Sequence, residues 1–129
     1  MSEIRNDRKY SKEHEWVLIQ GDLAIVGISD YAQNSLGDIV FLETRPIGEK
    51  LDSKQSFGTV ESVKAAEDLY APIGGEIAEI NQGLIKKPEE INSKPYDSWI
   101  IKIKSFNKSD YDNLMDFSAY QEFIKTLES

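Results

Sequence analysis

The sequence predicts a mainly β fold: a sandwich or barrel of short antiparallel strands, followed by a helical appendage. Two observations support this prediction. About seven short apolar runs, many of them rich in β-branched or aromatic residues, are separated by turn residues, and after Phe106 the apolar residues recur at helical spacing instead. A chain of 129 residues with 40% hydrophobic content is also long enough to fold as one domain around a real core.

The apolar runs predict strands, in chain order, at residues 16–19, 23–28, 38–43, 57–63, 68–71, 76–80 and 99–104. Gly21 and Asp22 lie between the first two runs and predict a hairpin turn. Pro46 and Gly48 end the third strand, and residues 51–55 form a polar connection to the fourth.

The alternation of side chains along a strand predicts which of them are buried. Phe57, Thr59 and Val63 are expected on one face of the fourth strand. Pro72 cannot donate to a β-ladder, so it ends the fifth strand, and the two glycines that begin at Gly74 turn the chain into the sixth. Four aromatic residues that fall on strand patterns are expected in the core: Trp16, Phe41, Phe57 and Trp99.

Capping residues predict where a helix interrupts the strands. Asp30 at the N-cap, with Gln33 at the N3 position, starts a short helix, and Gly37 ends it in a left-handed conformation. The Pro-Glu-Glu segment at residues 88–90 begins a helical turn, because proline is tolerated at the first position and acids are favourable near the positive end of the helix dipole.

The C-terminal segment predicts two further helices. Ser109 or Asp110 caps the first, which runs through Met115, and Ser118 with Gln121 forms a capping box for the second. An apolar stripe at helical spacing is expected to pack against the rest of the domain; it consists of Tyr120, Phe123, Ile124 and Leu127.

Composition excludes several classes of function. The chain has 15 Lys+Arg and 23 Asp+Glu, a net charge of −8 and no basic tract, which argues against a nucleic-acid or anionic-membrane partner. The absence of cysteine excludes a disulfide framework, a cysteine nucleophile, iron–sulfur ligation and thiolate zinc sites. The single histidine, His14, leaves no His-rich metal site, and we interpret it as a structural, half-exposed residue beside Trp16 rather than a catalytic base.

The chain shows no targeting or membrane-spanning segment. No apolar run approaches ~20 residues, and the first residues lack the apolar stretch of a signal peptide and contain acids, contrary to a transit peptide. We therefore expect a monomeric domain over residues 1–129, with residues 1–7 as a flexible lead and residues 107–129 as the helical appendage. The expected location is the bacterial cytoplasm, although a mature mitochondrial form would look alike.

Lys64 has the setting of a modification site. It lies where one apolar run ends and the next begins, so we expect it at a hairpin tip. Small residues follow it, and Glu61, Glu67 and Asp68 flank it. An exposed amine on a flexible four-carbon stem is suited to enzymatic acylation, although a surface lysine without a function is the simplest interpretation of position alone.

Five segments together resemble a known family. Glu-Ser-Val-Lys-Ala at residues 61–65, followed by Asp-Leu-Tyr-Ala-Pro at residues 68–72, resembles the lipoyl-attachment hairpin of the glycine cleavage system H protein family. The resemblance covers residues 8–127. The other segments, in the family's order, are residues 8–17, 27–33 with 36–41, 57–61, and 91–92 with 95–96 and Trp99. The resemblance implies a lipoyl/biotinyl-type barrel-sandwich hybrid with a short inserted helix and C-terminal helices.

The sequence departs from the family pattern in two loops. Gly74-Gly75 stands where the family often has Ser-Gly, and residues 97–98 replace a longer acidic and glycine-containing stretch. Neither departure touches the hairpin. The tripeptide Val-Lys-Ala around Lys64 also differs from the Asp-Lys-Ala of 2-oxoacid dehydrogenase lipoyl domains and the Met-Lys-Met of biotin carriers.

The resemblance implies a carrier protein rather than an enzyme. Lipoic acid would be attached to Lys64, on an arm of about eleven bonds that reaches ~14 Å. The implied partners are the pyridoxal-phosphate-dependent glycine decarboxylase (P-protein), which loads an aminomethyl group, the aminomethyltransferase (T-protein), which removes it, and dihydrolipoamide dehydrogenase (L-protein), which reoxidises the dithiol. Lipoylating enzymes would recognise Glu61, Val63 and Ala65. No metal is implied.

Family position also supplies candidates that hold the loaded arm, because a cationic amine forms charge-assisted hydrogen bonds with acidic or hydroxylic side chains. The candidates are Glu13, Glu15, Ser29, Ser35 and Asp68. We hypothesise that Glu15 or Asp68 holds the amine. For Glu13 and Glu15 the alternative is a solvated strand edge with no role in binding.

Three other functions stay open at this point. An H-like protein could relay lipoate to other complexes without turning over glycine. A small hydrolase could use Glu13 or Glu15 with Asp68 as paired carboxylates, although the sequence specifies neither their separation nor unequal environments. A non-catalytic β interaction module is the remaining alternative.

Overall fold

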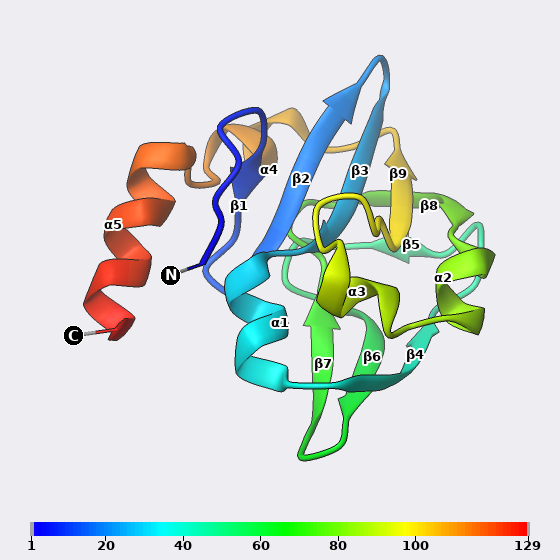
Figure 1. Ribbon diagram of the computed structural model, residues 1–129. Helices are drawn as coiled ribbons and strands as arrows, with labels where there is room; N and C mark the ends of the chain where they lie inside the picture. The colour runs from blue at the N-terminus through cyan, green and yellow to red at the C-terminus, as the bar shows by residue number, and fades with distance from the viewer. Residues whose placement is uncertain (1, 129) are drawn as a thin grey trace.

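The computed structural model describes residues 2–128 and arranges them in short strands and helices (Figure 1). The strands are β1 (Lys9–Tyr10), β2 (Glu15–Gln20), β3 (Leu23–Ile28), β4 (Ile39–Thr44), β5 (Lys50–Leu51), β6 (Ser56–Ser62), β7 (Ala66–Tyr70), β8 (Gly75–Ile80) and β9 (Ile101–Lys104). The helices are α1 (Asp30–Leu36), α2 (Gln82–Lys86), α3 (Glu90–Ser93), α4 (Lys108–Asp112) and α5 (Phe117–Glu128).

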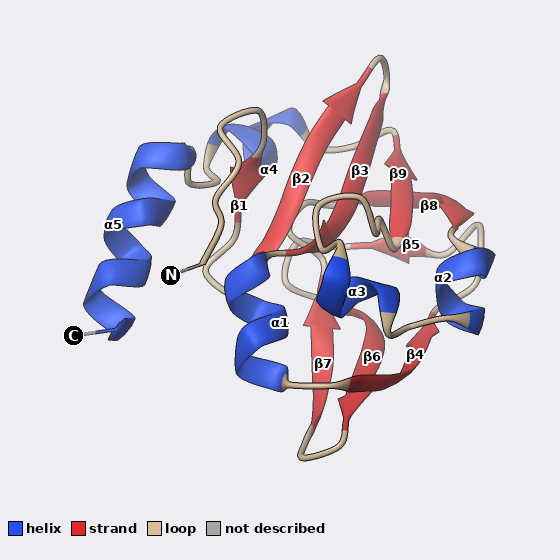
Figure 2. Ribbon diagram, viewed as in Figure 1, coloured by secondary structure: helices blue, strands red, loops and turns tan. Residues whose placement is uncertain are grey.

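Two antiparallel sheets enclose the main core (Figure 2). One has six strands in the order β1-β2-β3-β9-β8-β5, and the other has three in the order β4-β6-β7. Buried aliphatic residues from both sheets, such as Val26, Ile103, Leu42 and Val60, form one cluster between them. The predicted mainly β fold of short antiparallel strands is therefore confirmed.

The long apolar runs were the easiest elements to predict. The seven expected strands all appear, with ends shifted by a few residues. The two-residue strands β1 and β5, as well as helix α2, were not predicted. Such short strands exist because a distant segment pairs with them, and their own residues carry no periodic signal. The turn that opens at Pro88 leads into α3, whose first residue is Glu90.

Three predicted helix caps are each wrong by one or more residues. Ser29, rather than Asp30, caps α1 and accepts a hydrogen bond from the amide of Ala32. Asn107 caps α4, and Asp116 accepts from the amide of Ala119 at the start of α5. In each case an eligible polar residue precedes the predicted one, and the backbone conformation decides between neighbours that cap equally well. Gly37 does adopt the predicted positive φ, at 81°.

Two β-bulges correct the predicted core position of Phe41 and the predicted shared face of Phe57 and Val63. In β4, Ile39 pairs with Ser62 and Phe41 with Glu61, so Val40 is the extra residue and the alternation reverses. Phe41 is therefore 43% exposed instead of lying in the core. In β6 a second bulge between Ser56 and Gly58 takes Phe57 out of the strand's alternation. Phe57 is therefore buried, whereas Val63 is 71% exposed.

A second apolar cluster covers the outer side of β1 to β3. It contains Trp16 and Tyr10 from the sheet, Tyr96 from the loop after α3, and Tyr120 and Ile124 from α5. The expected packing of the α5 stripe is confirmed for Tyr120, Ile124 and the half-buried Phe123, whereas Leu127 is exposed. Of the predicted core aromatics, Trp16 and Phe57 are buried, and Trp99 is half-buried.

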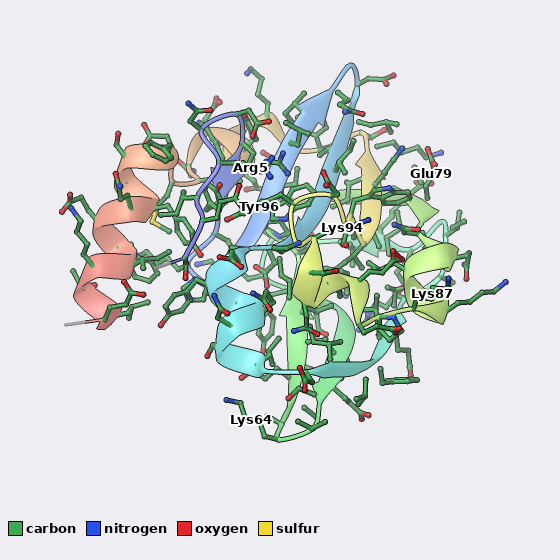
Figure 3. The ribbon with its side chains drawn as sticks, in the orientation of Figure 1. Arg5, Lys64, Glu79, Lys87, Lys94 and Tyr96 are labelled. Carbon is green, nitrogen blue, oxygen red and sulfur yellow. The ribbon has the colours of Figure 1, made fainter. Side chains whose placement is uncertain are left out.

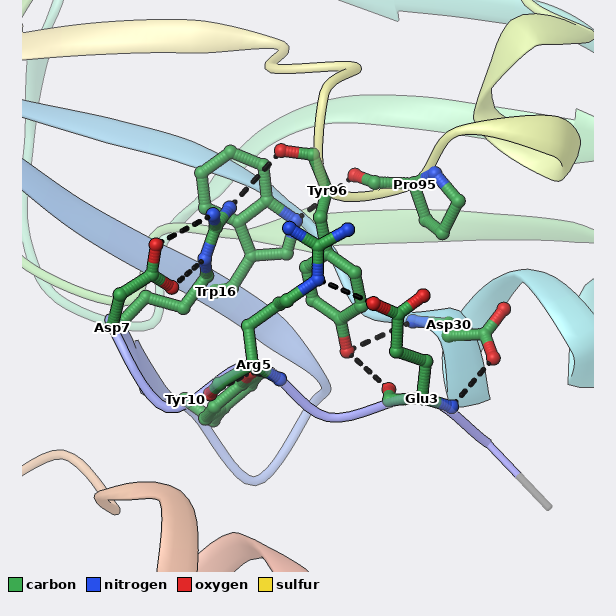
Figure 4. A network of polar contacts seen from close by, with 9 residues as sticks. Glu3, Arg5, Asp7, Tyr10, Trp16, Asp30, Pro95 and Tyr96 are labelled. Carbon is green, nitrogen blue, oxygen red and sulfur yellow. Dashed lines mark hydrogen bonds and ion pairs between the residues drawn. The ribbon is translucent and has the colours of Figure 1, made fainter.

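The N-terminal residues lie against this cluster (Figure 4). The backbone amide of Glu3 donates to the Asp30 carboxylate at 2.8 Å, and the Tyr96 hydroxyl donates to the Glu3 carbonyl at 2.6 Å. The Arg8 guanidinium lies 4.5 Å above the Trp16 ring and donates to the Tyr96 carbonyl. The predicted division into a lead over 1–7, a body and an appendage over 107–129 stays a prediction; Met1 and Ser129 lie outside the described residues.

Replacing Gly27 by alanine is expected to destabilise the fold by about 2 kcal/mol. A Cβ at this position would lie 2.6 Å from Cε2 and 2.9 Å from Nε1 of Trp16. The indole cannot retreat easily, because its Nε1 donates to the Pro95 carbonyl and Arg8 covers its ring. Urea denaturation measures the effect. Gly83→Ala in α2 is the control: it has room for a methyl group and is expected to gain about 0.5–1 kcal/mol. A Gly27→Ala variant as stable as the wild type would contradict this packing.

Candidate functional site

The turn between β6 and β7 presents Lys64 at the tip of a hairpin. The amide of Ser62 donates to the Ala65 carbonyl at 2.7 Å, which closes the turn. The Ser62 hydroxyl oxygen accepts from the amides of Lys64 and Ala65 at 3.3 and 3.1 Å. The amide of Val63 donates to the Asp38 carbonyl at 3.0 Å, so the tip is also tied to the segment that follows α1. The backbone around Lys64 is therefore ordered by local hydrogen bonds.

The side chain of Lys64 is exposed and extends away from the tip (Figure 3). It passes over Gly37 at the end of α1, where the lysine Cε would lie 3.5 Å from a Cβ built on that glycine. That distance is an ordinary van der Waals contact, so glycine is favoured at position 37 by the positive φ that ends the helix and not by the lysine stem. The hairpin position predicted for Lys64 agrees with this placement.

Strand β7 forms the open edge of the three-stranded sheet, since it pairs with β6 on one side. Glu15, the first residue of β2, meets the far end of this edge. One Glu15 carboxylate oxygen, Oε2, accepts from the amide of Tyr70 at 3.3 Å, and the other, Oε1, accepts from the Ser11 hydroxyl at 2.5 Å. Lys64 and Glu15 therefore lie near opposite ends of β7.

Glu15 is a buried carboxyl group. Its side chain is 2% exposed, so the alternative of a solvated strand edge is wrong for this residue. Burial raises the pKa of Glu15 to about 7, because the charged form loses its hydration, and hydrogen bonds from Ser11 and Tyr70 offset part of that effect. A carboxyl with such a pKa exchanges its proton near neutral pH, which is typical of functional sites.

The other candidates differ in how accessible they are. Asp68 is exposed on β7 opposite Thr59, between Lys64 and the Glu15 end of the strand. Glu13 is exposed in the turn before β2, and Ser35 is exposed on α1 close to Gly37. The roles of these three residues in holding an arm stay predictions.

Ser29 is occupied by structural contacts. Its side chain is fully buried, caps α1 and lies 2.7 Å from the Tyr120 hydroxyl. His14 adjoins the same group: its Nδ1 lies 2.8 Å from that hydroxyl, and its ring lies beside Tyr31 and Phe123. The expected half-exposed state of His14 is confirmed, and its place beside Trp16 stays a prediction. His14 has a φ of 73° ahead of β2, so its side chain does not follow the alternation of the strand.

A cavity of about 420 Å³ opens next to Ser11, beyond the end of β7. Its lining includes Glu13, Ala71 and Pro72 from this region, together with Ser53 and Lys54 from the loop after β5. No spacing in the sequence pointed to Ser11 or to this loop. The loop reaches the cavity through tertiary packing, since the amide of Lys54 donates to the Ala71 carbonyl. Within residues 2–128 no cluster of three or more His, Asp or Glu side chains is arranged to hold a metal ion.

Comparison with known proteins places this geometry in a family. The model of the family described as glycine cleavage H-protein matches residues 8–127. The chain belongs to the glycine cleavage H-protein family. A glycine cleavage system H protein from Leptospira biflexa is 45% identical over 119 residues, which cover 92% of each chain. One from Methylacidiphilum infernorum is 48% identical over 126 residues, covering 97% of this chain and 98% of the relative.

A solved structure of the family has the same fold. The crystal structure of a glycine cleavage system H protein from Mycobacterium marinum superimposes with a TM-score of 0.83 and 32% sequence identity, and the match covers 98% of this chain and 100% of the other. The family membership and the barrel-sandwich fold that the sequence implied are therefore confirmed. In the described part of the chain, no helix has the length and apolar character needed to cross a membrane.

Proposed function

We propose that this protein is the lipoyl carrier of a glycine cleavage system and that lipoic acid is attached to Lys64. The observation that supports this most strongly is an exposed lysine at an ordered hairpin tip, inside the segment that matches the family. When attached, the lipoyl group supplies a strained disulfide that takes up the aminomethyl unit of glycine and is left as a dithiol after the unit is passed on.

The residues around Lys64 fit such an arm. The Lys64 side chain is exposed and the next residue, Ala65, is small, so the amine is accessible. An arm of ~14 Å matches the length of about four residues of extended strand. Counted from Lys64, the end of the arm therefore reaches the level of Asp68, two residues before Tyr70, whose amide donates to Glu15.

The polar groups near the far end of β7 fit a cationic cargo. Ionised Glu15 would offer a carboxylate that is shielded from water, and Asp68 offers a second one along the strand. We assign these two residues to holding the amine, since charge-assisted hydrogen bonds gain strength where water is excluded. The adjacent cavity provides space for the group that the arm carries.

In this role the protein is a substrate of other enzymes and is not itself catalytic. We propose as partners the glycine decarboxylase, the aminomethyltransferase, dihydrolipoamide dehydrogenase and the lipoylating enzymes. As location we propose the bacterial cytoplasm, since the relatives named above come from bacteria. The sequence contains no cysteine, so the reduced arm meets no thiol of its own chain that could form a mixed disulfide.

Two measurements test the function. Intact mass of protein purified from its native host is expected to show a lipoyl increment on every chain. The lipoylated protein is then expected to support glycine–bicarbonate exchange by the cognate decarboxylase. Lipoylation without exchange would instead favour the lipoate relay, and unmodified protein from lipoate-replete cells would contradict both carrier functions.

The combined change Glu15→Gln and Asp68→Asn is expected to shorten the lifetime of the amine-loaded form at least about a hundredfold. The reason is that each charge-assisted hydrogen bond is worth about 1.5–3 kcal/mol, and these neutral amides cannot offer it. Spontaneous release of ammonia from loaded protein measures the lifetime. The control is Glu67→Gln, because strand alternation points this neighbour of Asp68 to the other side. An unchanged lifetime in the double variant would rule out this cradle.

A further inference from the structure

Three large apolar side chains are exposed beside Lys64. Val40 is 56% exposed, Phe41 43% and Val63 71%, and we call these residues the tip patch. The bulge in β4 turns Phe41 outward and leaves Val40 unpaired, while Val63 stands in the turn itself. An exposed aromatic and two exposed valines oppose the hydrophobic effect, so their gathering near one functional lysine calls for a partner that covers them.

Pairing places the three residues around one point. Phe41 is opposite Glu61 across the two strands, and Val63 follows Glu61 by two residues. The backbone amide of Val63 donates to the Asp38 carbonyl, two residues before Val40. The three residues of the tip patch therefore lie on two backbone segments that are bonded to each other next to Lys64.

Acidic side chains surround the tip patch. Asp38, Glu43 and Glu61 are exposed, and none of them takes part in any ion pair found among residues 2–128. Unpaired carboxylates around an apolar centre complement a partner surface with an apolar centre and basic side chains at its rim. Such charges also speed the encounter with that partner at low ionic strength.

We propose that the tip patch docks the enzyme that acylates Lys64, through an apolar surface with a basic rim. This rests on the proposed lipoylation of Lys64. The Nζ atom lies within about 6 Å of its own Cα, so an acylating enzyme must press against the residues next to Lys64. Enzymes that act on the end of the arm work ~14 Å from the same Cα and have no such need.

The chemistry at Lys64 is an acyl transfer. The neutral amine attacks the carbonyl carbon of an activated lipoyl donor, either an acyl phosphate anhydride or a thioester. An amide bond forms from Nζ to that carbon, the bond from the carbon to the phosphate oxygen or thiol sulfur breaks, and the amine loses its proton. The tip patch acts by binding and orienting, because none of its side chains can move a proton.

The test compares acylation rates of apoprotein variants with a purified lipoate-activating ligase, lipoic acid and ATP, followed by intact mass. The double change Val40→Ser and Phe41→Ser is expected to lower kcat/KM for acylation at least about tenfold, as truncation of docking anchors does. Ile47→Ser removes an equally exposed apolar residue away from the tip patch and is the control. Thermal melting checks that all variants fold.

A competition experiment reports binding without acylation. Lys64→Arg protein cannot be acylated and is expected to inhibit the acylation of wild type, whereas Lys64→Arg combined with the two serine changes is expected not to. If wild type itself gains no lipoyl group, the proposed function fails, and this proposal with it. The docking proposal alone is overturned if wild type and the double serine variant are acylated at equal rates and the serine changes leave inhibition by Lys64→Arg protein unaltered. If the serine variant is acylated as fast as wild type but no longer supports glycine–bicarbonate exchange, the tip patch binds the decarboxylase instead, and the docking proposal is again overturned.

Discussion

Lys64→Arg protein is expected to fold normally, to carry no lipoyl group and to support less than about 1% of wild-type glycine–bicarbonate exchange. The guanidinium stays protonated at any accessible pH and its nitrogens share the charge, so it cannot attack an activated acyl donor. The side chain is exposed and makes no ion pair among the described residues, so the free energy of unfolding should change by less than about 0.5 kcal/mol.

Intact mass, exchange rate and thermal melting measure these three expectations together. Lys87→Arg makes the same chemical change at an exposed lysine next to α2, far from the hairpin tip (Figure 3), and is expected to behave as wild type in all three. A lipoyl increment that persists in Lys64→Arg protein would move the attachment site to another lysine.

Glu15→Gln is expected to make the protein more stable than wild type at pH 8, while the two are similar at pH 4.5. In the folded protein the pKa of Glu15 is raised to about 7 by burial, from about 4.5 in the unfolded chain. This difference corresponds to about 3 kcal/mol. The glutamine amide resembles the protonated acid, because its nitrogen can donate to the Ser11 hydroxyl and its oxygen can accept from the Tyr70 amide.

The direction follows from proton binding. Between pH 4.5 and 7 the unfolded chain has released the Glu15 proton and the folded protein still holds it, so this group's contribution to stability falls as pH rises. Above pH 7 both states are ionised and the penalty is constant. The negative charge of Glu13 adds to the rise in the pKa of Glu15. Glutamine carries none of this penalty.

Urea denaturation of both proteins at several pH values gives the difference in their free energies of unfolding. The contributions of all other titrating groups cancel in this difference, because both proteins share them. The difference is expected to grow by about 3 kcal/mol from pH 4.5 to pH 8, in favour of the glutamine variant. Glu61→Gln makes the same chemical change at an exposed side chain and serves as the matched control. A constant difference for Glu15→Gln would mean that this carboxyl is ionised in the fold at pH 5.

The sequence was sufficient to place Lys64 and the strands that position it. An uninterrupted apolar run on each side of a polar turn specifies a hairpin through local interactions alone, and the register between β6 and β7 follows from the turn. The bulges were not predictable. Val40 is an extra residue only because of the way in which β4 pairs with β6. The exposure of Phe41 follows from that single extra residue.

Glu15 shows the other limit of prediction. Its place at the start of a strand, among charged neighbours, favours a solvated carboxylate as much as a functional one. What buries it is contact with Ser11 four residues earlier and with the Tyr70 amide, 55 residues later in the chain. The contact with the Tyr70 amide is long-range and has no signature in spacing or hydrophobicity, so the environment that raises the pKa of Glu15 is visible only in the folded structure.

The open edge of β7 has a further consequence, for colloidal behaviour. An unpaired strand edge is a template on which the edge of a second molecule can form a continuous intermolecular sheet, the first step of aggregation. In β7 the central positions Glu67 and Asp68 are exposed acids, so two such edges that approach one another repel. These charges therefore protect a concentrated protein from self-association, whatever cargo it carries.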